Sequence, residues 1–228
     1  KKILAENLRQ KEQKNQQLIK ELESTKKKIE GLELTIKSKV GEDKKLFGSV
    51  NAASLQHALD AGDGVLDLEK GTYRITRPVV INTVENGYGG ISGRSGASRI
   101  VMEGAGPAIR VVGNHNGTAS PSTYKESTWQ NERMPILEGF EILGRHPQAV
   151  GIELVKTTKT VISRVLVREC QIGIHLVERN RDFILSDSHL LNNSHFGLFF
   201  DRCNLHQIIV HGNHISWNGK AGIKSLDG

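Results

Sequence analysis

The sequence predicts an all-β solenoid, a coil of stacked parallel strands, preceded by an α-helical coiled-coil segment. The first observation is a glycine-led phrase that returns at Gly151, Gly173, Gly197 and Gly222, with spacings of 22, 24 and 25 residues. A unit of this size cannot bury its own apolar face, so successive units have to stack. The second observation is a heptad pattern that runs through the first forty residues.

Each repeat contains short runs in which apolar and polar residues alternate, as in residues 151–154. This alternation is typical of half-buried strands, and a repeat leaves no room for a crossover helix. Counting seven residues back from the glycines predicts that Leu166, Leu190 and Ile215 all point into the coil. The consensus of a leucine-rich repeat is absent, and the repeat is too short for a propeller blade.

Residues 183–193 and 207–218 resemble rungs of the right-handed parallel β-helix proteins, the pectate-lyase-like superfamily. The upstream residues 54–75 resemble the entry segment of that superfamily, in which an amphipathic helix caps the open end of the coil. The resemblance implies a right-handed parallel β-helix over residues 51–228 with an N-terminal capping helix. Because the last repeat has only begun at Gly222, we expect further turns beyond residue 228 or a cap from a partner.

The first forty residues predict a coiled-coil helix, followed by a linker at residues 41–50. Leucine and isoleucine dominate the a and d positions of five heptads, with Asn15, Lys11 and Thr25 as exceptions. A helix this polar is marginal alone, so we expect homo-oligomers formed through residues 1–40. Dimers and trimers are both compatible with the pattern, and a solvated helix without a partner is the alternative.

The composition of the chain limits the classes of partner that it is expected to bind. The chain has 31 basic and 25 acidic residues, much of the excess lying in the predicted rod, and no nucleic-acid motif accompanies it. Nucleic acid is therefore an unlikely partner, and no apolar run is long enough to span a membrane. Cys170 and Cys203 fall at different phases of the repeat and read as free, small hydrophobic residues. We expect a secreted protein whose signal peptide is not part of this chain.

Stacking the repeats on their glycines arranges polar residues in columns. One column holds Glu153, His175 and Lys224, and another places His189 beside His214. Neighbouring rungs lie about 4.8 Å apart, so these five side chains are the candidate catalytic residues for acid–base work on a sugar. The alternative is that the columns are polar because they face water.

A long polar segment at residues 113–135 interrupts the repeat. It contains Tyr124, Trp129 and Arg133, which are the candidate ligand-binding residues, since aromatic rings stack on sugars and Arg bonds hydroxyls. The alternative is that Trp129 only pins the segment to the wall of the coil.

Cofactors are not indicated. No metal-binding motif accompanies the histidines, and no acidic column forms, so calcium is compatible with the superfamily but unsupported by these residues. The Asp-Asp pair that polygalacturonases use for hydrolysis is also missing. In the polysaccharide lyases of the superfamily a Lys or Arg removes a proton next to the uronate carboxylate.

The resemblance therefore implies a secreted carbohydrate-active protein, similar to the lyases or hydrolases. The alternative is a non-catalytic, oligomeric polysaccharide-binding adhesin or a tailspike-like structural protein, in which the rod supplies multivalency.

Overall fold

The computed structural model describes residues 51–132, 134–203 and 205–226, with the short pieces 16–17, 39–40 and 46–47. The chain divides into two units, residues 1–48 and 49–228. In the first unit, β1 (Lys39–Val40) pairs antiparallel with β2 (Leu46–Phe47). β1 falls on the last two residues of the predicted coiled coil, and β2 falls within the predicted linker. The rest of the predicted coiled coil lies outside the described residues, apart from the helical Gln16 and Gln17. Both the coiled coil and the linker therefore stay predictions.

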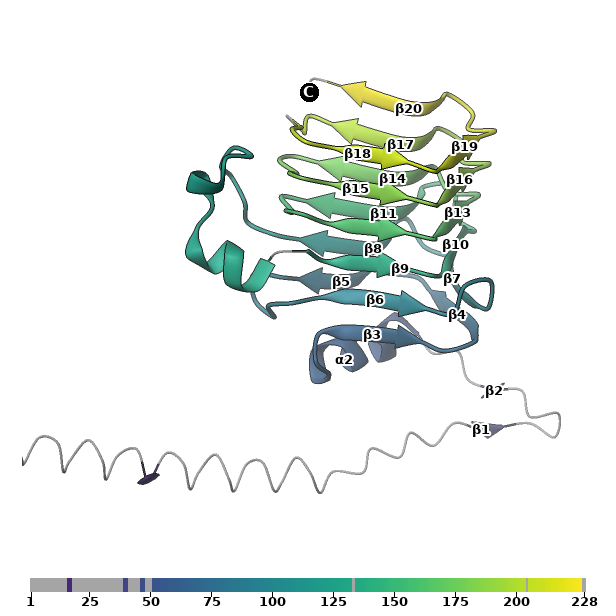
Figure 1. Ribbon diagram of the computed structural model, residues 1–228. Helices are drawn as coiled ribbons and strands as arrows, with labels where there is room; N and C mark the ends of the chain where they lie inside the picture. Colours follow the sequence, from purple (N-terminus) through teal and green to yellow (C-terminus); the bar gives the residue numbers. More distant parts are fainter. Residues whose placement is uncertain are drawn as a thin grey trace, which may run out of the picture. The chain divides into compact units, whose positions relative to one another are not determined.

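The second unit is a right-handed parallel β-solenoid of about six turns, as predicted (Figure 1). Helix α2 (Ala52–Ala61) precedes three six-stranded parallel sheets, and each turn adds one strand to each sheet. The β3 sheet consists of β3 (Val65–Leu68), β6 (Gly90–Gly93), β9 (Ile136–Glu138), β12 (Val161–Ser163), β15 (Ile184–Ser186) and β18 (Ile209–His211). The β4 sheet consists of β4 (Gly71–Ile75), β7 (Ser98–Met102), β10 (Glu141–Gly144), β13 (Leu166–Arg168), β16 (His189–Leu191) and β19 (His214–Ser216). The β5 sheet consists of β5 (Val79–Asn82), β8 (Gly106–Val112), β11 (Ala149–Val155), β14 (Ile172–Val177), β17 (Phe196–Asp201) and β20 (Ala221–Leu226).

The core is a set of aliphatic columns, one inside each sheet. In the β5 sheet, Ile152, Ile174 and Leu198 stack in register and are fully buried. Narrow turns leave room for aliphatic side chains between the three sheets, which explains the low aromatic content of 5%. The core columns thus follow directly from the residue after each repeat glycine.

One inward column was predicted with the wrong register. The buried partner of Leu190 is Val167, whereas Leu166 is half-buried and pairs with the exposed His189. The corner between β13 and β14 is one residue shorter than the corner between β16 and β17, so counting back from the glycine misses by one position. A slip of one residue moves a side chain to the opposite face of a strand.

The repeat glycines are required because the backbone of the next turn lies against them. A Cβ built on Gly173 would lie 2.5 Å from the carbonyl oxygen of Gly197, and one on Gly151 would lie 2.4 Å from that of Gly173. Real Cβ atoms do not approach a carbonyl oxygen so closely, so only glycine fits at these two positions. The repeat in the sequence is therefore the imprint of this close stacking.

The corners between the β3 and β4 sheets use left-handed backbone. Arg164 (φ 52°) and Asp187 (φ 51°) occupy this corner in successive turns, and Gly139 (φ 74°) and Gly212 (φ 65°) occupy it in the turns before and after. Non-glycine residues are uncommon in this backbone region. Because arginine, aspartate and glycine all occupy the corner here, it shows no simple sequence signature.

Helix α2 caps the N-terminal end of the coil, as the sequence predicted. Asn51 is its N-cap, with Oδ1 accepting a hydrogen bond from the Ser54 amide at 3.0 Å, and Leu55 is buried in the core. The side-chain amide of Gln56 hydrogen-bonds the backbone of Val80 at the open edge of the β5 sheet, where a neighbouring strand is missing. Its Nε2 donates to the Val80 carbonyl at 2.9 Å, and its Oε1 accepts from the Val80 amide at 2.7 Å.

Both cysteines are free and buried. Burial raises the pKa of Cys170 to about 12 and that of Cys203 to about 11, so both are protonated thiols near neutral pH. They pack as small hydrophobic side chains, in agreement with their interpretation from the sequence.

Within the part of the chain that the structure describes, no helix is long and apolar enough to cross a membrane.

Candidate functional site

A single outward column on the β5 sheet collects most of the predicted catalytic residues. Register places Arg110, Glu153, His175, Phe199 and Lys224 as successive partners in β8, β11, β14, β17 and β20. In β8, β11, β14 and β17 each alternates with buried apolar residues, so these side chains face away from the core. The column predicted from the repeat spacing therefore exists, and it begins one strand earlier, at Arg110.

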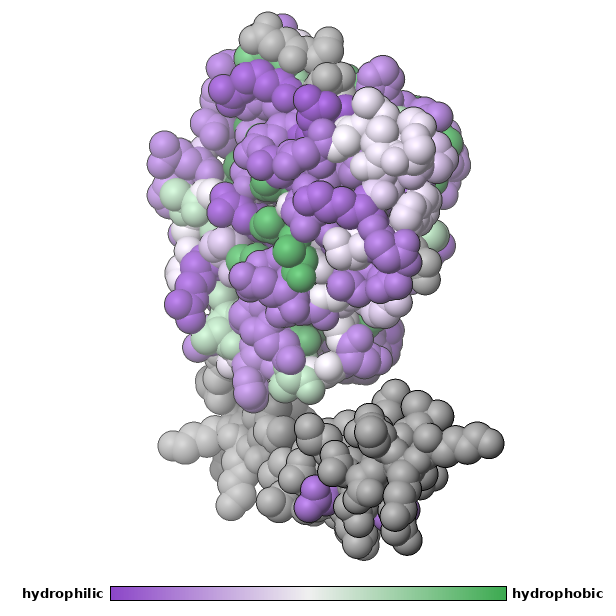
Figure 2. Space-filling model, turned by 90° about the vertical axis from the view of Figure 1, so that its left-hand side faces the viewer, coloured by the Kyte–Doolittle hydropathy of each residue, from purple (hydrophilic) through white to green (hydrophobic). Residues whose placement is uncertain are grey.

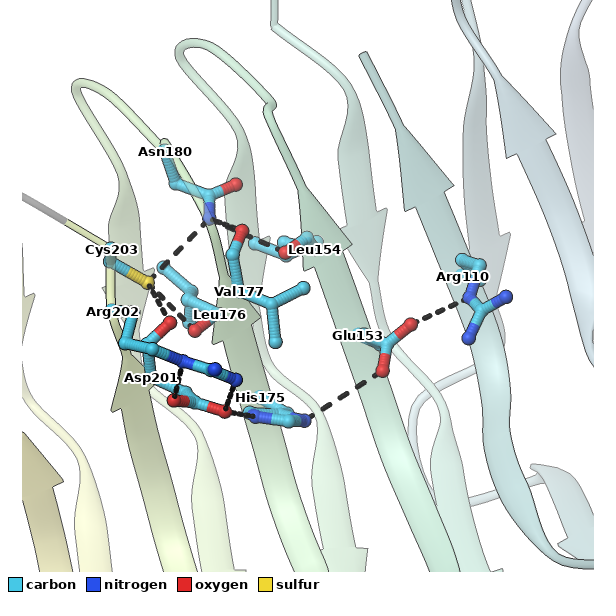
Figure 3. Close-up of polar contacts among 10 residues, drawn as sticks. All are labelled: Arg110, Glu153, Leu154, His175, Leu176, Val177, Asn180, Asp201, Arg202 and Cys203. Carbon is cyan, nitrogen blue, oxygen red and sulfur yellow. Dashed lines mark hydrogen bonds and ion pairs between the residues drawn. The ribbon is translucent and has the colours of Figure 1, made fainter. Parts of the chain in front are cut away.

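Five charged or titratable side chains form a continuous chain of contacts along this face (Figure 3). Arg110 Nε donates to Glu153 Oε1 at 2.6 Å, and Glu153 Oε2 lies 3.7 Å from His175 Nδ1. On its other side, His175 Nε2 lies 3.4 Å from Asp201 Oδ2, and Arg202 Nε donates to Asp201 Oδ1 at 2.8 Å. We call these five residues the polar chain.

The centre of the polar chain is shielded from solvent. The side chains of Glu153, His175 and Asp201 are only 12%, 15% and 13% exposed. The hydrogen bond from Arg202, with a smaller contribution from His175, lowers the pKa of Asp201 below its usual value and outweighs the opposing effect of burial. Asp201 is therefore a carboxylate that holds one ring nitrogen of His175, and Glu153 faces the other.

An aromatic cluster adjoins the polar chain. The Phe199 ring stacks on the His175 ring with a centroid distance of 5.1 Å and an interplanar angle of 5°. Phe196 lies 4.8 Å from Phe199, and Lys220 Nζ lies 6.0 Å from the Phe196 ring centroid. Both phenylalanines are half-buried and face outward, so the sheet carries an aromatic surface next to ionised groups.

The two predicted histidine partners lie elsewhere. His189 and His214 are register partners in the β4 sheet, with ring centroids 5.6 Å apart, and both are exposed. They are adjacent, as the spacing predicted, but they belong to a different sheet from His175. Lys224 shares the column of His175 but is separated from it by Phe199. The five predicted catalytic residues thus form two groups.

The polar insertion lies on the corner between the β5 and β3 sheets and projects from one side of the coil (Figure 1). It contains two short helical turns, η1 (Pro121–Thr123), which is followed directly by Tyr124, and η2 (Thr128–Glu132), which contains Trp129. The surface on this side is mostly hydrophilic, with a small hydrophobic patch near its middle (Figure 2).

Tyr124 anchors the insertion. It is only 9% exposed, stacks on His115 at 4.2 Å and lies 4.9 Å from the Trp129 ring. Its hydroxyl donates to Asp182 Oδ2 at 3.0 Å and accepts from Thr158 Oγ1 at 3.1 Å. In this geometry the tyrosine ring packs against His115 and Trp129, so Tyr124 pins the insertion to the coil, a role that the sequence suggested for Trp129.

The Trp129 side chain is more exposed to solvent than that of Tyr124. It is half-buried, and Lys159 Nζ lies 5.2 Å from its ring centroid. Lys159 also forms an ion pair with Asp182 and thus ties the tryptophan to the corner. Arg133, the third predicted ligand-binding residue, lies outside the described residues.

The sequence interpretation missed Arg110, Asp201 and Arg202. Asp201 lies two residues after Phe199, so its Cα partner is Val177 and not His175. Its side chain reaches diagonally to His175, a contact that position within a repeat does not reveal. Arg110 was detectable in principle, because it stands four residues after Gly106 in a strand with the same alternation.

Metal ions have no evident place in this arrangement. Among the residues that the structure describes, no three His, Cys, Asp or Glu side chains are grouped so that they could hold a metal ion.

Two solved structures share the fold. ORF18 of Geobacillus virus E2 is 17% identical, with a TM-score of 0.54 over 71% of this chain and 35% of the viral chain. The Agl-KA catalytic domain is 13% identical, with a TM-score of 0.57 over 85% of this chain and 37% of that chain. At these identities the likeness concerns the fold, and this chain spans little more than a third of either protein.

The N-terminal part has a different relative. Residues 20–86 match the family described as ribosomal protein L9, C-terminal domain. The large ribosomal subunit protein bL9 of Cytophaga hutchinsonii is 42% identical over 59 residues, which cover 26% of this chain and 40% of that protein. The match continues through α2 into the first turn of the coil, as far as the loop after β5.

The larger match covers the coil itself. Residues 56–228, well over half of the chain, match the family described as the right handed beta helix region. This match agrees with the three parallel sheets and with the resemblance seen in the rungs. The chain therefore belongs to the right-handed β-helix family.

Proposed function

We propose that this protein binds a polysaccharide along the outer face of the β5 sheet. The observation that carries the proposal is the aromatic surface of Phe196 and Phe199 beside the polar chain. Sugars present apolar C–H faces that stack on aromatic rings and hydroxyls that bond charged side chains. An open face built from repeated strands suits a polymer, because each strand offers one further row of side chains. Secretion and multivalency through residues 1–40 belong to the same proposal.

Substitution of Phe199 by alanine tests this proposal. We expect the F199A variant to bind its polysaccharide at least about 10-fold more weakly, which corresponds to about 1.4 kcal/mol. Phe199 faces outward, so the coil is expected to remain folded. Fluorescence titration with dextran, laminarin, xylan and polygalacturonate measures the binding, and circular dichroism checks the fold.

The matched control is Leu191→Ala, which also removes a half-buried, outward-facing apolar side chain, but from the β4 sheet. The control is expected to bind like the unchanged protein. Equal losses in the two variants, or no binding to any of the four polysaccharides, would refute the proposed site.

A second candidate function is acid–base cleavage of the bound polysaccharide. It is favoured by the position of His175 between Glu153 and Asp201. A protonated His175 can give its proton to the leaving glycosidic oxygen, while a carboxylate removes a proton from the attacking water or, in an elimination, from a ring carbon. The two carboxylates come from strands two spacings apart and are offset by two residues, about 12 Å between Cα atoms, with His175 between them.

Substitution of His175 by alanine separates the two candidates. If the protein cleaves its ligand, the H175A variant is expected to lose turnover while its affinity changes little, because a general acid acts mainly in the transition state. New reducing ends and unsaturated products are the readouts. His211→Ala, which removes an exposed histidine of β18 on the β3 sheet, is the control and is expected to keep full turnover. Undiminished turnover in H175A would exclude the polar chain from catalysis.

A further inference from the structure

A hollow of about 870 Å³ lies at the N-terminal end of the β5 sheet, between α2, β5 and the loop that follows β5. Two other hollows on the described residues are smaller, at about 250 and 350 Å³. Neither the repeat nor the polar chain accounts for it.

The floor of the hollow is apolar and its rim is polar. Ala52, Ala53, Pro78 and Val80 supply the apolar side chains. This surface resembles the small apolar platforms on which one face of a sugar ring can rest. The floor is therefore suited to a ring with C–H groups on one side.

Several polar groups at the rim have no partner within the described residues. The side chains of His57, Arg77 and Glu85 line the hollow and make no hydrogen bond or ion pair with other described residues. Asp60 is held in place, because its Oδ1 accepts from Gln56 Nε2 at 2.9 Å and from Asn86 Nδ2 at 3.2 Å. Hydrogen-bond donors and acceptors thus surround the floor on more than one side.

The charges at the rim disfavour a polyanion. The lining of the hollow contains two carboxylates, Asp60 and Glu85, and one guanidinium, Arg77. These two carboxylates and one guanidinium give an excess of negative charge, so a uronate or sulfate group would be repelled. Sugar hydroxyls, in contrast, donate well to carboxylates and accept from a guanidinium.

The hollow opens onto the same face as the polar chain. Val80 lines the hollow and is the register partner of Arg110, the first member of the polar chain. From Val80 to Phe199 the column crosses four strand spacings, about 19 Å, which a short oligosaccharide can bridge.

We infer that the hollow binds the terminal residue of an uncharged polysaccharide, whose following residues run along the polar chain toward the aromatic cluster. This inference rests on the proposed function and adds the charge class of the ligand and the position of its end. The α2 helix therefore has two roles, because it caps the coil and forms one wall of the hollow.

A large side chain introduced at an exposed position of α2 tests the inference by occupying the hollow. Ala53→Trp places a large ring in the hollow, whereas Ala58→Trp places the same ring on an exposed position of the same helix that does not line it. Isothermal titration calorimetry is carried out with laminarihexaose, maltohexaose, cellohexaose and hexagalacturonate. We expect at least one neutral hexasaccharide to bind more tightly than hexagalacturonate. We also expect A53W to weaken that binding at least 10-fold, while A58W leaves it unchanged.

The outcomes separate the two levels of the proposal. If A53W binds normally while F199A loses affinity, the hollow is not a subsite and the proposed function stands. Tighter binding of hexagalacturonate would overturn the inference about charge. If no hexasaccharide binds, or if F199A and A53W both bind normally, both the inference and the proposed site are refuted.

Discussion

Leu190→Asp is expected to prevent stable folding of the coil. Leu190 is fully buried in β16, between its register partners Val167 and Ile215 in the neighbouring turns. An aspartate at this position puts an unpaired carboxylate among aliphatic side chains, at a cost well above about 3 kcal/mol. Urea unfolding followed by circular dichroism measures the change in the free energy of unfolding.

The neighbouring residue supplies the control for this substitution. His189 precedes Leu190 in the same strand and is exposed, so His189→Asp is expected to change the free energy of unfolding by less than about 1 kcal/mol. Similar destabilisation by the two aspartates would show that the inward and outward positions of β16 are assigned wrongly.

Gly173→Ala has the second largest expected effect on stability. The added methyl group would lie 2.5 Å from the carbonyl oxygen of Gly197 and 3.1 Å from Asn193 Nδ2. The oxygen belongs to the backbone of the next turn, so relief requires two turns to move apart. We expect a loss of more than about 2 kcal/mol in the free energy of unfolding.

Gly71, the first residue of β4, provides the comparison. A methyl group there would lie 3.9 Å from the nearest atoms of the Tyr73 side chain, an ordinary contact distance. Gly71→Ala is therefore expected to cost less than about 1 kcal/mol, since alanine also restricts the unfolded chain. Thermal unfolding of both variants distinguishes a steric cause from a general intolerance of substitution at strand glycines, which would lower both melting temperatures alike.

The sequence was sufficient to predict the coil because its main constraint recurs in several successive turns. Close backbone stacking demands glycine at Gly151, Gly173 and Gly197, and the residue after each glycine must fill the same core column. The capping helix was also predictable, since Asn51 and the buried Leu55 are local signals of a helix that begins on the coil. These features depend on residues that are close in sequence or related by the repeat.

The corners limited what the repeat could predict. Their lengths differ by single residues, which moved Val167 into the position assigned to Leu166. In the corners whose lengths differ, Glu169 (φ 57°) and Asn192 (φ 56°) adopt left-handed conformations without glycine. Counting residues back from the glycines of the β5 sheet therefore gives the wrong register in the β4 sheet. The spacing between successive glycines does not reveal how many residues each corner contains.

Taken alone, the sequence determined the fold class, the capping helix and the column of Glu153, His175 and Lys224, because periodic residues in a coil must lie one above another. Only the tertiary structure showed that Asp201 reaches diagonally to His175, that His189 and His214 lie on a separate sheet, and that Tyr124 is buried by its own insertion. The physical reason is that these contacts join different columns or join a non-repeating segment to the coil. Their distances depend on side-chain direction and corner geometry, which no spacing along the chain specifies.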